Sequence, residues 1–208
     1  YVPQKLVDAS WPSRWQTLPG SAVNWTIQEG GRKFQGQSAA GQTAWLAYQH
    51  QVPSMQVWDA IDSGQSIGGL RPKSTLIRDF YAYNSTEYDR RDSLESRFNR
   101  NWVGDLAMEA DIEVKSATGT LDLVLIEAGR HHRCRINLAD GAGELAVLLD
   151  DKAFPFDNEG SAEEKNERRL VSTGIRGPGH YRLRWANVDD ELTLWVNGSV
   201  VLPGAPPT

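Results

Sequence analysis

The chain has 208 residues and a formal net charge of −5, from 22 basic and 27 acidic residues. This length suits one large all-β domain, and the evenly mixed charges exclude the basic surface that nucleic acids or anionic membranes attract. A single cysteine, Cys134, excludes an internal disulfide framework and a cysteine-rich zinc site, and no apolar run reaches the roughly 18 to 20 residues that span a bilayer.

Short strands are predicted in the first part of the chain. Residues 1–20 show no sustained period and are interpreted as an irregular lead-in. Apolar and polar side chains alternate over 23–27, while 45–48 and 76–83 are rich in aromatic and β-branched residues. Both patterns are typical of strands, so we expect three strands here.

One short helix is predicted over residues 54–63. Ser54 is a favourable N-cap residue, and Val57 and Ile61 lie four apart, on one side of a helix. Gly64 then provides a stop signal. We expect this helix to pack at the rim of a β structure.

The clearest strand of the chain is predicted over 106–114, where apolar and polar residues alternate strictly. Residues 121–126 are apolar almost throughout, which is typical of a central strand covered on both faces. The segments 133–138 and 145–149 predict two further strands. Residues 157–169 are dense in charge and contain alanine as their only apolar residue, which predicts a mobile surface loop.

A three-strand meander is predicted near the C-terminus. Alternation over 181–185 is followed by a polar turn at 187–190 and by a second alternating segment at 192–196. Asn197 and Gly198 come next, and this dipeptide favours a type I′ hairpin turn because both central residues need a positive φ. The meander predicts an antiparallel sheet with one apolar face.

Together these elements predict an all-β jelly-roll sandwich of antiparallel strands with one short helix. Turn signals fall about 10 to 15 residues apart with no long amphipathic helix between them, which disfavours a parallel α/β sheet. We expect one domain over 1–208, with 203–208 as a linker. The chain begins without methionine and ends in a proline-rich segment, so we interpret it as a domain excised from a longer protein.

Three acids in the strand at 106–114 are the strongest candidates for catalysis. Glu109, Asp111 and Glu113 share one face, the arrangement with which a class of retaining β-glucanases supplies its nucleophile and general acid. The outer two Cα atoms of a straight strand are about 13 Å apart, whereas retaining chemistry needs carboxyl groups roughly 5 to 5.5 Å apart. The simpler interpretation is the solvated face of an amphipathic strand, and we predict no catalytic residue in this segment.

Metal sites find weak support in the sequence. His131 and His132 are adjacent, so on a strand they point to opposite faces and are expected at the surface or in hydrogen bonds. Residues 140–143 and 150–151 are interpreted as turns, because the grounds for calcium sites there are weaker. We therefore expect no bound metal and no cofactor.

The chain has eight tryptophans, which is many for its length. Trp195 alternates out of the apolar face of its strand and is the candidate for stacking against a sugar ring. In a two-layer fold Trp195 could instead pack against the other layer. We expect most of the other tryptophans in the core. The eight tryptophans are Trp11, Trp15, Trp25, Trp45, Trp58, Trp102, Trp185 and Trp195.

Two long segments resemble the concanavalin A-like, laminin-G-type sandwich. The first runs over 104–129 and contains the acidic strand and the G-x-L-x-L-x-L pattern at 119–125. The second runs over 177–200 and contains the D-E-L-x-L-W-V-N-G pattern at 190–198. The resemblance implies a concanavalin A-like jelly roll.

A narrower resemblance links the chain to the large domain inserted in certain long bacterial type I signal peptidases. It rests on three phrases, at 45–54, 79–84 and 101–106. Such enzymes cleave with a serine nucleophile in an S-M-x-P motif and a lysine base. Here Ser54 and Met55 are followed by Val57 where proline belongs, and the G-D-N-x-x-x-S-x-D-S-R box is absent, because 91–97 does not match it.

The resemblance implies a noncatalytic accessory domain, with the Ser/Lys dyad of the parent enzyme outside this segment. It would lie on the extracytoplasmic side of the bacterial cytoplasmic membrane and meet the membrane only through the parent's anchor. Expected partners are a preprotein substrate, an envelope protein or a glycan, and no nucleic acid. The alternatives are a carbohydrate-binding module using Trp195 and a retaining glycoside hydrolase using Glu109, Asp111 and Glu113.

Overall fold

The computed structural model describes residues 3–18, 25–70, 72–77, 103–156 and 167–201. The chain divides into two compact units, unit 1 at 1–102 and unit 2 at 103–208, where the sequence analysis expects a single domain. Antiparallel strands dominate the described residues, so the all-β class is confirmed. None of the helices among these residues is long and apolar enough to cross a bilayer.

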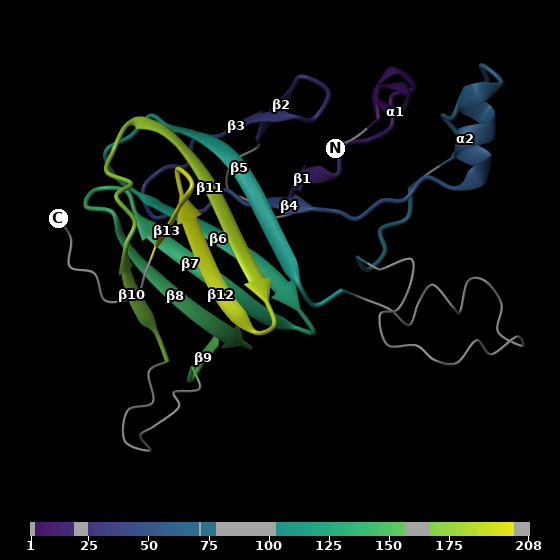
Figure 1. Ribbon diagram of the computed structural model, residues 1–208. Helices are drawn as coiled ribbons and strands as arrows, with labels where there is room; N and C mark the ends of the chain where they lie inside the picture. Colours follow the sequence, from purple (N-terminus) through teal and green to yellow (C-terminus); the bar gives the residue numbers. More distant parts are fainter. Residues whose placement is uncertain (1–2, 19–24, 71, 78–102, 157–166, 202–208) are drawn as a thin grey trace, which may run out of the picture. The chain divides into compact units, whose positions relative to one another are not determined.

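Unit 1 contains two helices and two small antiparallel sheets (Figure 1). Strands β1 and β4 pair with each other, as do β2 and β3. The elements are α1 (Gln4–Asp8), β1 (Trp15–Thr17), β2 (Thr26–Gln28), β3 (Lys33–Gln35), β4 (Leu46–Tyr48) and α2 (Met55–Asp62). Helix α1 and strand β1 lie in the part expected to be irregular, so that expectation, and the expectation of one helix only, are wrong.

The predicted helix at 54–63 is confirmed as α2. Ser54 occupies the N-cap position with an extended backbone, and Ser63 is the C-cap residue, whose hydroxyl donates to the Asp59 carbonyl at 2.7 Å. Gly64 follows with a φ of +70°, a conformation that glycine adopts without steric cost. The apolar side of α2 packs in a small core of unit 1, formed by Leu6, Trp11, Val57, Ala60 and Ile67.

Unit 2 consists of two antiparallel sheets (Figure 1). The four-stranded sheet has the order β13-β12-β11-β5, and the five-stranded sheet the order β10-β8-β7-β6 with β9 also paired to β8. The strands are β5 (Leu106–Val114), β6 (Thr120–Glu127), β7 (Arg130–Asn137), β8 (Ala142–Leu149), β9 (Lys152–Phe154), β10 (Arg169–Ser172), β11 (Gly179–Val188), β12 (Glu191–Val196) and β13 (Ser199–Val201).

The C-terminal meander forms as the alternation predicts. Asp189 and Asp190 join β11 to β12, and Asn197 and Gly198 join β12 to β13. All four have positive φ, between 50° and 83°, as a type I′ turn requires. The backbone twist of such turns matches that of the strands, so the β11-β12-β13 hairpins are set by local sequence.

The apolar segment at 121–126 is a correction to the sequence analysis. It lies in β6, which is an edge strand of the five-stranded sheet rather than a central one. Its inward residues Leu123 and Leu125 are buried, while Ile126 remains 59% exposed. The apolar composition of β6 therefore did not mean that both of its faces are fully covered. Its place in the sheet depends on pairing between distant segments, which composition does not indicate.

One core is shared by the two sheets of unit 2. It contains Leu123, Leu125, Cys134, Ile136, Leu145, Val171, Ile175, Leu183, Trp185, Leu194 and Val196. Cys134 is fully buried as a free thiol, and burial, with a smaller contribution from Asp122, raises its pKa to about 12. It acts as a small apolar residue, as expected from its alternation with Ile136.

Several expectations concern residues outside the described ranges. They are the start of the strand at 23–27, most of the strand at 76–83, most of the loop at 157–169 and the linker at 203–208. These remain predictions.

Candidate recognition face

Strand β5 places three carboxylates on the outer face of the four-stranded sheet. Glu109, Asp111 and Glu113, here called the acidic row, are exposed, whereas the alternate residues Met108 and Ile112 face the core. The strict alternation of the sequence produces this division because successive side chains of a strand point to opposite faces. The solvated face predicted for this strand is therefore present.

A row of basic side chains lies directly opposite on the neighbouring strand. The register of β11 and β5 pairs His180 with Glu113, Arg182 with Asp111 and Arg184 with Glu109. We call His180, Arg182 and Arg184 the basic row. Arg182 Nε donates to Asp111 Oδ1 at 3.1 Å, and Arg184 Nε lies 3.7 Å from Glu109 Oε1.

This arrangement places a cation near each carboxylate and leaves the carboxylates in water. The side chains of Asp111 and Glu109 are 77% and 69% exposed, and Glu113 has Lys115 Nζ at 3.8 Å. Each carboxylate of the acidic row thus lies close to a cationic side chain and remains exposed to solvent.

Trp195 lies on the same outer face, beside Arg184. Its cross-strand partners are Arg184 on β11 and Val200 on β13, and its neighbours Leu194 and Val196 are buried. The Arg184 guanidinium carbon is 4.9 Å from the centre of the indole ring, within the range of a cation–π contact. Four cross-strand neighbours thus form one row across the sheet, in the order Val200, Trp195, Arg184 and Glu109.

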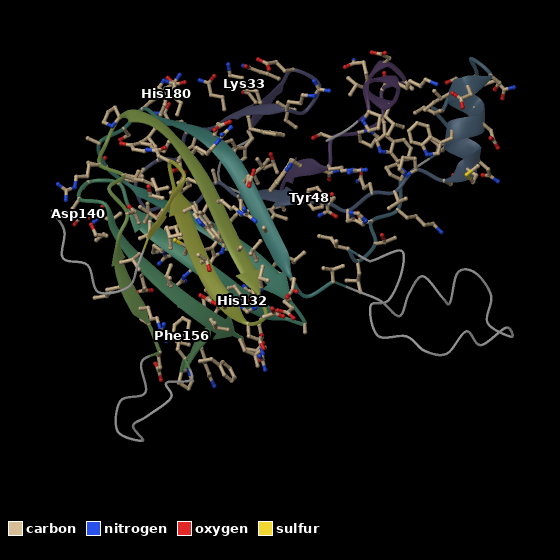
Figure 2. The ribbon with its side chains drawn as sticks, in the orientation of Figure 1. Lys33, Tyr48, His132, Asp140, Phe156 and His180 are labelled. Carbon is tan, nitrogen blue, oxygen red and sulfur yellow. The ribbon has the colours of Figure 1, made fainter. Side chains whose placement is uncertain are left out.

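Unit 2 also contains a buried polar cluster, which we call the His132 cluster: His132, Glu127 and Asn187. Figure 2 labels His132 among the strands of unit 2. Asn187 Nδ2 donates to Glu127 Oε2 at 2.8 Å, and this same oxygen lies 3.4 Å from His132 Nε2. His132 is 4% exposed and Asn187 is 2% exposed. The Trp185 indole N–H donates to the His132 carbonyl at 3.2 Å and links β11 to β7.

The His132 cluster keeps its histidine neutral. Burial lowers the pKa of His132, and nearby Glu127 and Asp190 oppose this effect only partly. Neither ring nitrogen, nor Asn187 Oδ1, makes a well-aligned hydrogen bond within the part of the chain that the structure describes. Charging the ring would therefore be costly at this position.

The expected opposite directions of the paired histidines are confirmed, but among the described residues His132 is neither at the surface nor in a well-aligned hydrogen bond. The predicted turn at 140–143 is shorter than expected, because β8 begins at Ala142. His131 is exposed and His132 is buried, so the two rings point to opposite faces. Asp140 accepts the Ala142 N–H at 2.9 Å within a turn, and Asp150 and Asp151 have the positive φ of turn residues. Within the described ranges, no three His, Cys, Asp or Glu side chains gather closely enough to hold a metal ion.

The sequence analysis missed the basic row and the His132 cluster. The signals were present, because His180, Arg182 and Arg184 alternate as strictly as the acids, and His132 alternates with Cys134 and Ile136. What the sequence did not report is which strand lies beside which.

Comparison with family models, with curated proteins and with solved structures finds no match to this chain.

Proposed function

We propose that the chain is a noncatalytic recognition domain with a concanavalin A-like jelly-roll fold. Its context would be a membrane-anchored bacterial type I signal peptidase, in which it lies on the extracytoplasmic side and positions a preprotein, an envelope protein or a glycan. The fold proposal is supported by two antiparallel sheets that share one core. The context is supported by the resemblance of the phrases at 45–54, 79–84 and 101–106.

The observation that carries the noncatalytic part is the ion-paired acidic row. Glu109 and Asp111 each face an arginine of β11, and all four side chains are about half exposed or more. Glycoside hydrolysis requires one protonated and one ionised carboxyl group across a bound sugar. Here Glu109 and Asp111 are alike in their exposure and in having an arginine as partner, so their surroundings lack the asymmetry that the reaction needs.

A carbohydrate-binding module is the second candidate because Trp195 lies on the outer face. Sugars stack on flat aromatic rings, and the Trp195 ring belongs to the exposed side of the sheet. Arg184 already lies 4.9 Å from its centre. A sugar would have to share the ring with this guanidinium, so we place this candidate second.

A hydrolysis assay and the flanking gene sequence test the proposal. Incubation of the chain with β-1,3-glucan and mixed-linkage glucan is expected to release no reducing sugar, with Glu109→Gln identical to the original protein. Hydrolysis that disappears in Glu109→Gln would overturn the noncatalytic claim. The gene is expected to encode an S-M-x-P serine upstream and a G-D-N box downstream, and flanks without both motifs would remove the peptidase context.

A further inference from the structure

We propose that the free edge of β5 binds an extended peptide as an added strand, and that the preferred peptide alternates basic and apolar residues. The inference rests on the proposed recognition function and gives it a ligand class. It follows from the strand order, from the direction of the backbone groups of β5 and from the charge of the acidic row.

Strand β5 is the longest edge strand of unit 2. It has nine residues and, among the described residues, pairs with β11 alone. Edge strand β13 has three residues, β9 three and β10 four, and short edges of this kind are a common protection against unwanted strand pairing. The other long edge is β6, with eight residues. Within the described part of unit 2, long edges are therefore confined to β5 and β6.

The tight turns show which backbone groups of β5 face this edge. In a two-residue hairpin the two residues that flank the turn form backbone hydrogen bonds with each other. The backbone N–H and C=O groups of Val188 therefore face β12, and so do those of every second residue of β11 before it. In agreement, the Arg182 carbonyl accepts the Asn197 N–H at 2.8 Å. The intervening residues of β11 bond to β5, as Leu183 does opposite Ala110. The backbone N–H and C=O groups of the acidic row consequently point to the free edge.

The side chains near this edge define the chemistry of the peptide. A residue placed opposite Asp111 on an added strand would have its Cβ about 4.5–5.5 Å away on the same face, so lysine or arginine there would pair with the carboxylate. The alternate residues of the peptide would point toward the core side, next to Leu106, Met108 and Ile112. These three are only partly buried against the core, so an apolar neighbour would cover them.

A second copy of the chain is a poor occupant for the same edge. If two β5 strands paired antiparallel about Asp111, every acid of one row would face an acid of the other. Like charges directly opposite each other destabilise strand pairing. The acidic row thus opposes self-association and favours a basic partner, which combines protection of the edge with selection of a ligand.

Binding is tested with a fluorescently labelled nine-residue peptide in which lysine alternates with valine, titrated into the complete chain. One control peptide carries glutamate in place of lysine, and another carries the same residues with the lysines grouped at one end. We expect saturable binding of the alternating peptide, with both controls at least about tenfold weaker, because only the first places its charges opposite the acidic row. Equal binding of the grouped peptide would mean charge attraction alone and would overturn the proposal.

Two proline variants locate the binding edge. Asp111→Pro removes an N–H that points to the free edge and so takes no bond from the pairing with β11. Val124→Pro is the matched control on β6, because Ala128 and Gly129 form a two-residue turn and the Val124 N–H therefore faces that strand's free edge. We expect Asp111→Pro to abolish binding and Val124→Pro to leave it unchanged. The opposite result would place the site on β6 and overturn the proposal.

A charge reversal covers the possibility that Asp111→Pro fails to fold. In the double variant Glu109→Lys and Glu113→Lys we expect the preference to switch to the glutamate peptide, and retained preference for lysine would contradict the inference.

In the original chain, residue-resolved hydrogen exchange should show new protection at Glu109, Asp111 and Glu113 when peptide is added. If peptide binding fails while the glucan assay and the flanking motifs turn out as expected, only this inference falls. Glucan hydrolysis would instead remove the proposed function.

Discussion

The two sheets of unit 2 each have an ion pair between neighbouring strands, and the two pairs differ in burial. On the four-stranded sheet, Asp111 and Arg182 are 77% and 73% exposed and meet through one hydrogen bond of 3.1 Å. On the five-stranded sheet, Arg135 donates twice to Asp122, at 2.8 and 2.6 Å, and the Asp122 side chain is only 9% exposed.

The difference separates a structural pair from a pair that remains available to a partner. The bonds to Asp122 raise the pKa of the Arg135 guanidinium, and their fork geometry fixes both side chains. Asp111 keeps most of its surface in water and can accept another cation without losing Arg182. The same residue types thus form a close two-bond pair on one sheet and an exposed single-bond pair on the other, where we propose that they take part in recognition.

Asp122→Ala should give the largest loss of stability. The change leaves the partly buried guanidinium of Arg135 without its fork partner, so we expect the free energy of unfolding of unit 2 to fall by about 1–2 kcal/mol. Cys134 is the only cysteine and is buried in unit 2, so the rate of thiol labelling in urea reports the opening of this unit alone. Asp122→Asn is the control with similar shape. Unchanged labelling in Asp122→Ala would mean that the pair of Asp122 with Arg135 contributes nothing to stability.

Acidification should weaken unit 2 through the His132 cluster. Burial lowers the folded-state pKa of His132 below the usual value of 6.5, so the unfolded chain binds the proton first. This contribution is complete above about pH 6.5, decreases as the pH falls below that value and levels off below the lowered pKa. Thiol labelling of the original chain and of His132→Gln across this range measures the effect as a difference. A difference that does not change with pH would contradict the assignment.

Arg184→Ala should have a smaller effect, on the stability and on the exposure of Trp195. Removing the guanidinium deletes a cation–π contact at a partly exposed site, which is typically worth about 0.5–1 kcal/mol. The indole ring then becomes more accessible, so acrylamide should quench the tryptophan fluorescence more strongly. Arg184→Lys, which retains a cation, is the control. Identical quenching in all three proteins would show that Arg184 does not cover the ring.

Asp111→Ala should give the smallest effect, a loss below about 0.5 kcal/mol that shrinks further as salt is added. Arg182→Ala should behave alike, and the double variant should lose no more than the sum of the two. Thiol labelling at low and high salt provides the measurement. A loss as large as that of Asp122→Ala would make the exposed pair structural and would remove the contrast between the two sheets.

Local sequence predicted those parts of the fold that depend on neighbouring residues. The alternation at 106–114 gave the bounds of β5 and the outward direction of its acids, and Asn197-Gly198 gave its turn. These features follow from the two-residue period of a strand and from the need for positive φ. The helix predicted at 54–63 likewise begins after Ser54 and ends before Gly64, although the Ser54 side chain makes no capping hydrogen bond.

Features that depend on distant residues escaped prediction. Asp111 and Arg182 are 71 positions apart, and only the register of β5 with β11 brings them together. The edge position of β6 and the meeting of His132 with Asn187 are of the same kind. Periodicity predicts the face of the sheet on which a side chain lies, whereas strand order and register determine its neighbours. The candidate site depends on strand order and register, so it could not be predicted from periodicity.

A disulfide between β5 and β11 would report the register that sets the acidic row against the basic row. Asp111 and Arg182 form a pair whose backbones do not bond to each other, with Cα atoms typically about 4.5 Å apart, a distance that a disulfide can bridge. We expect Asp111→Cys with Arg182→Cys to form this bond on mild oxidation, and Asp111→Cys with Arg184→Cys to form none. Crosslinking of the second pair in place of the first would show another register and would mean that the two rows do not pair.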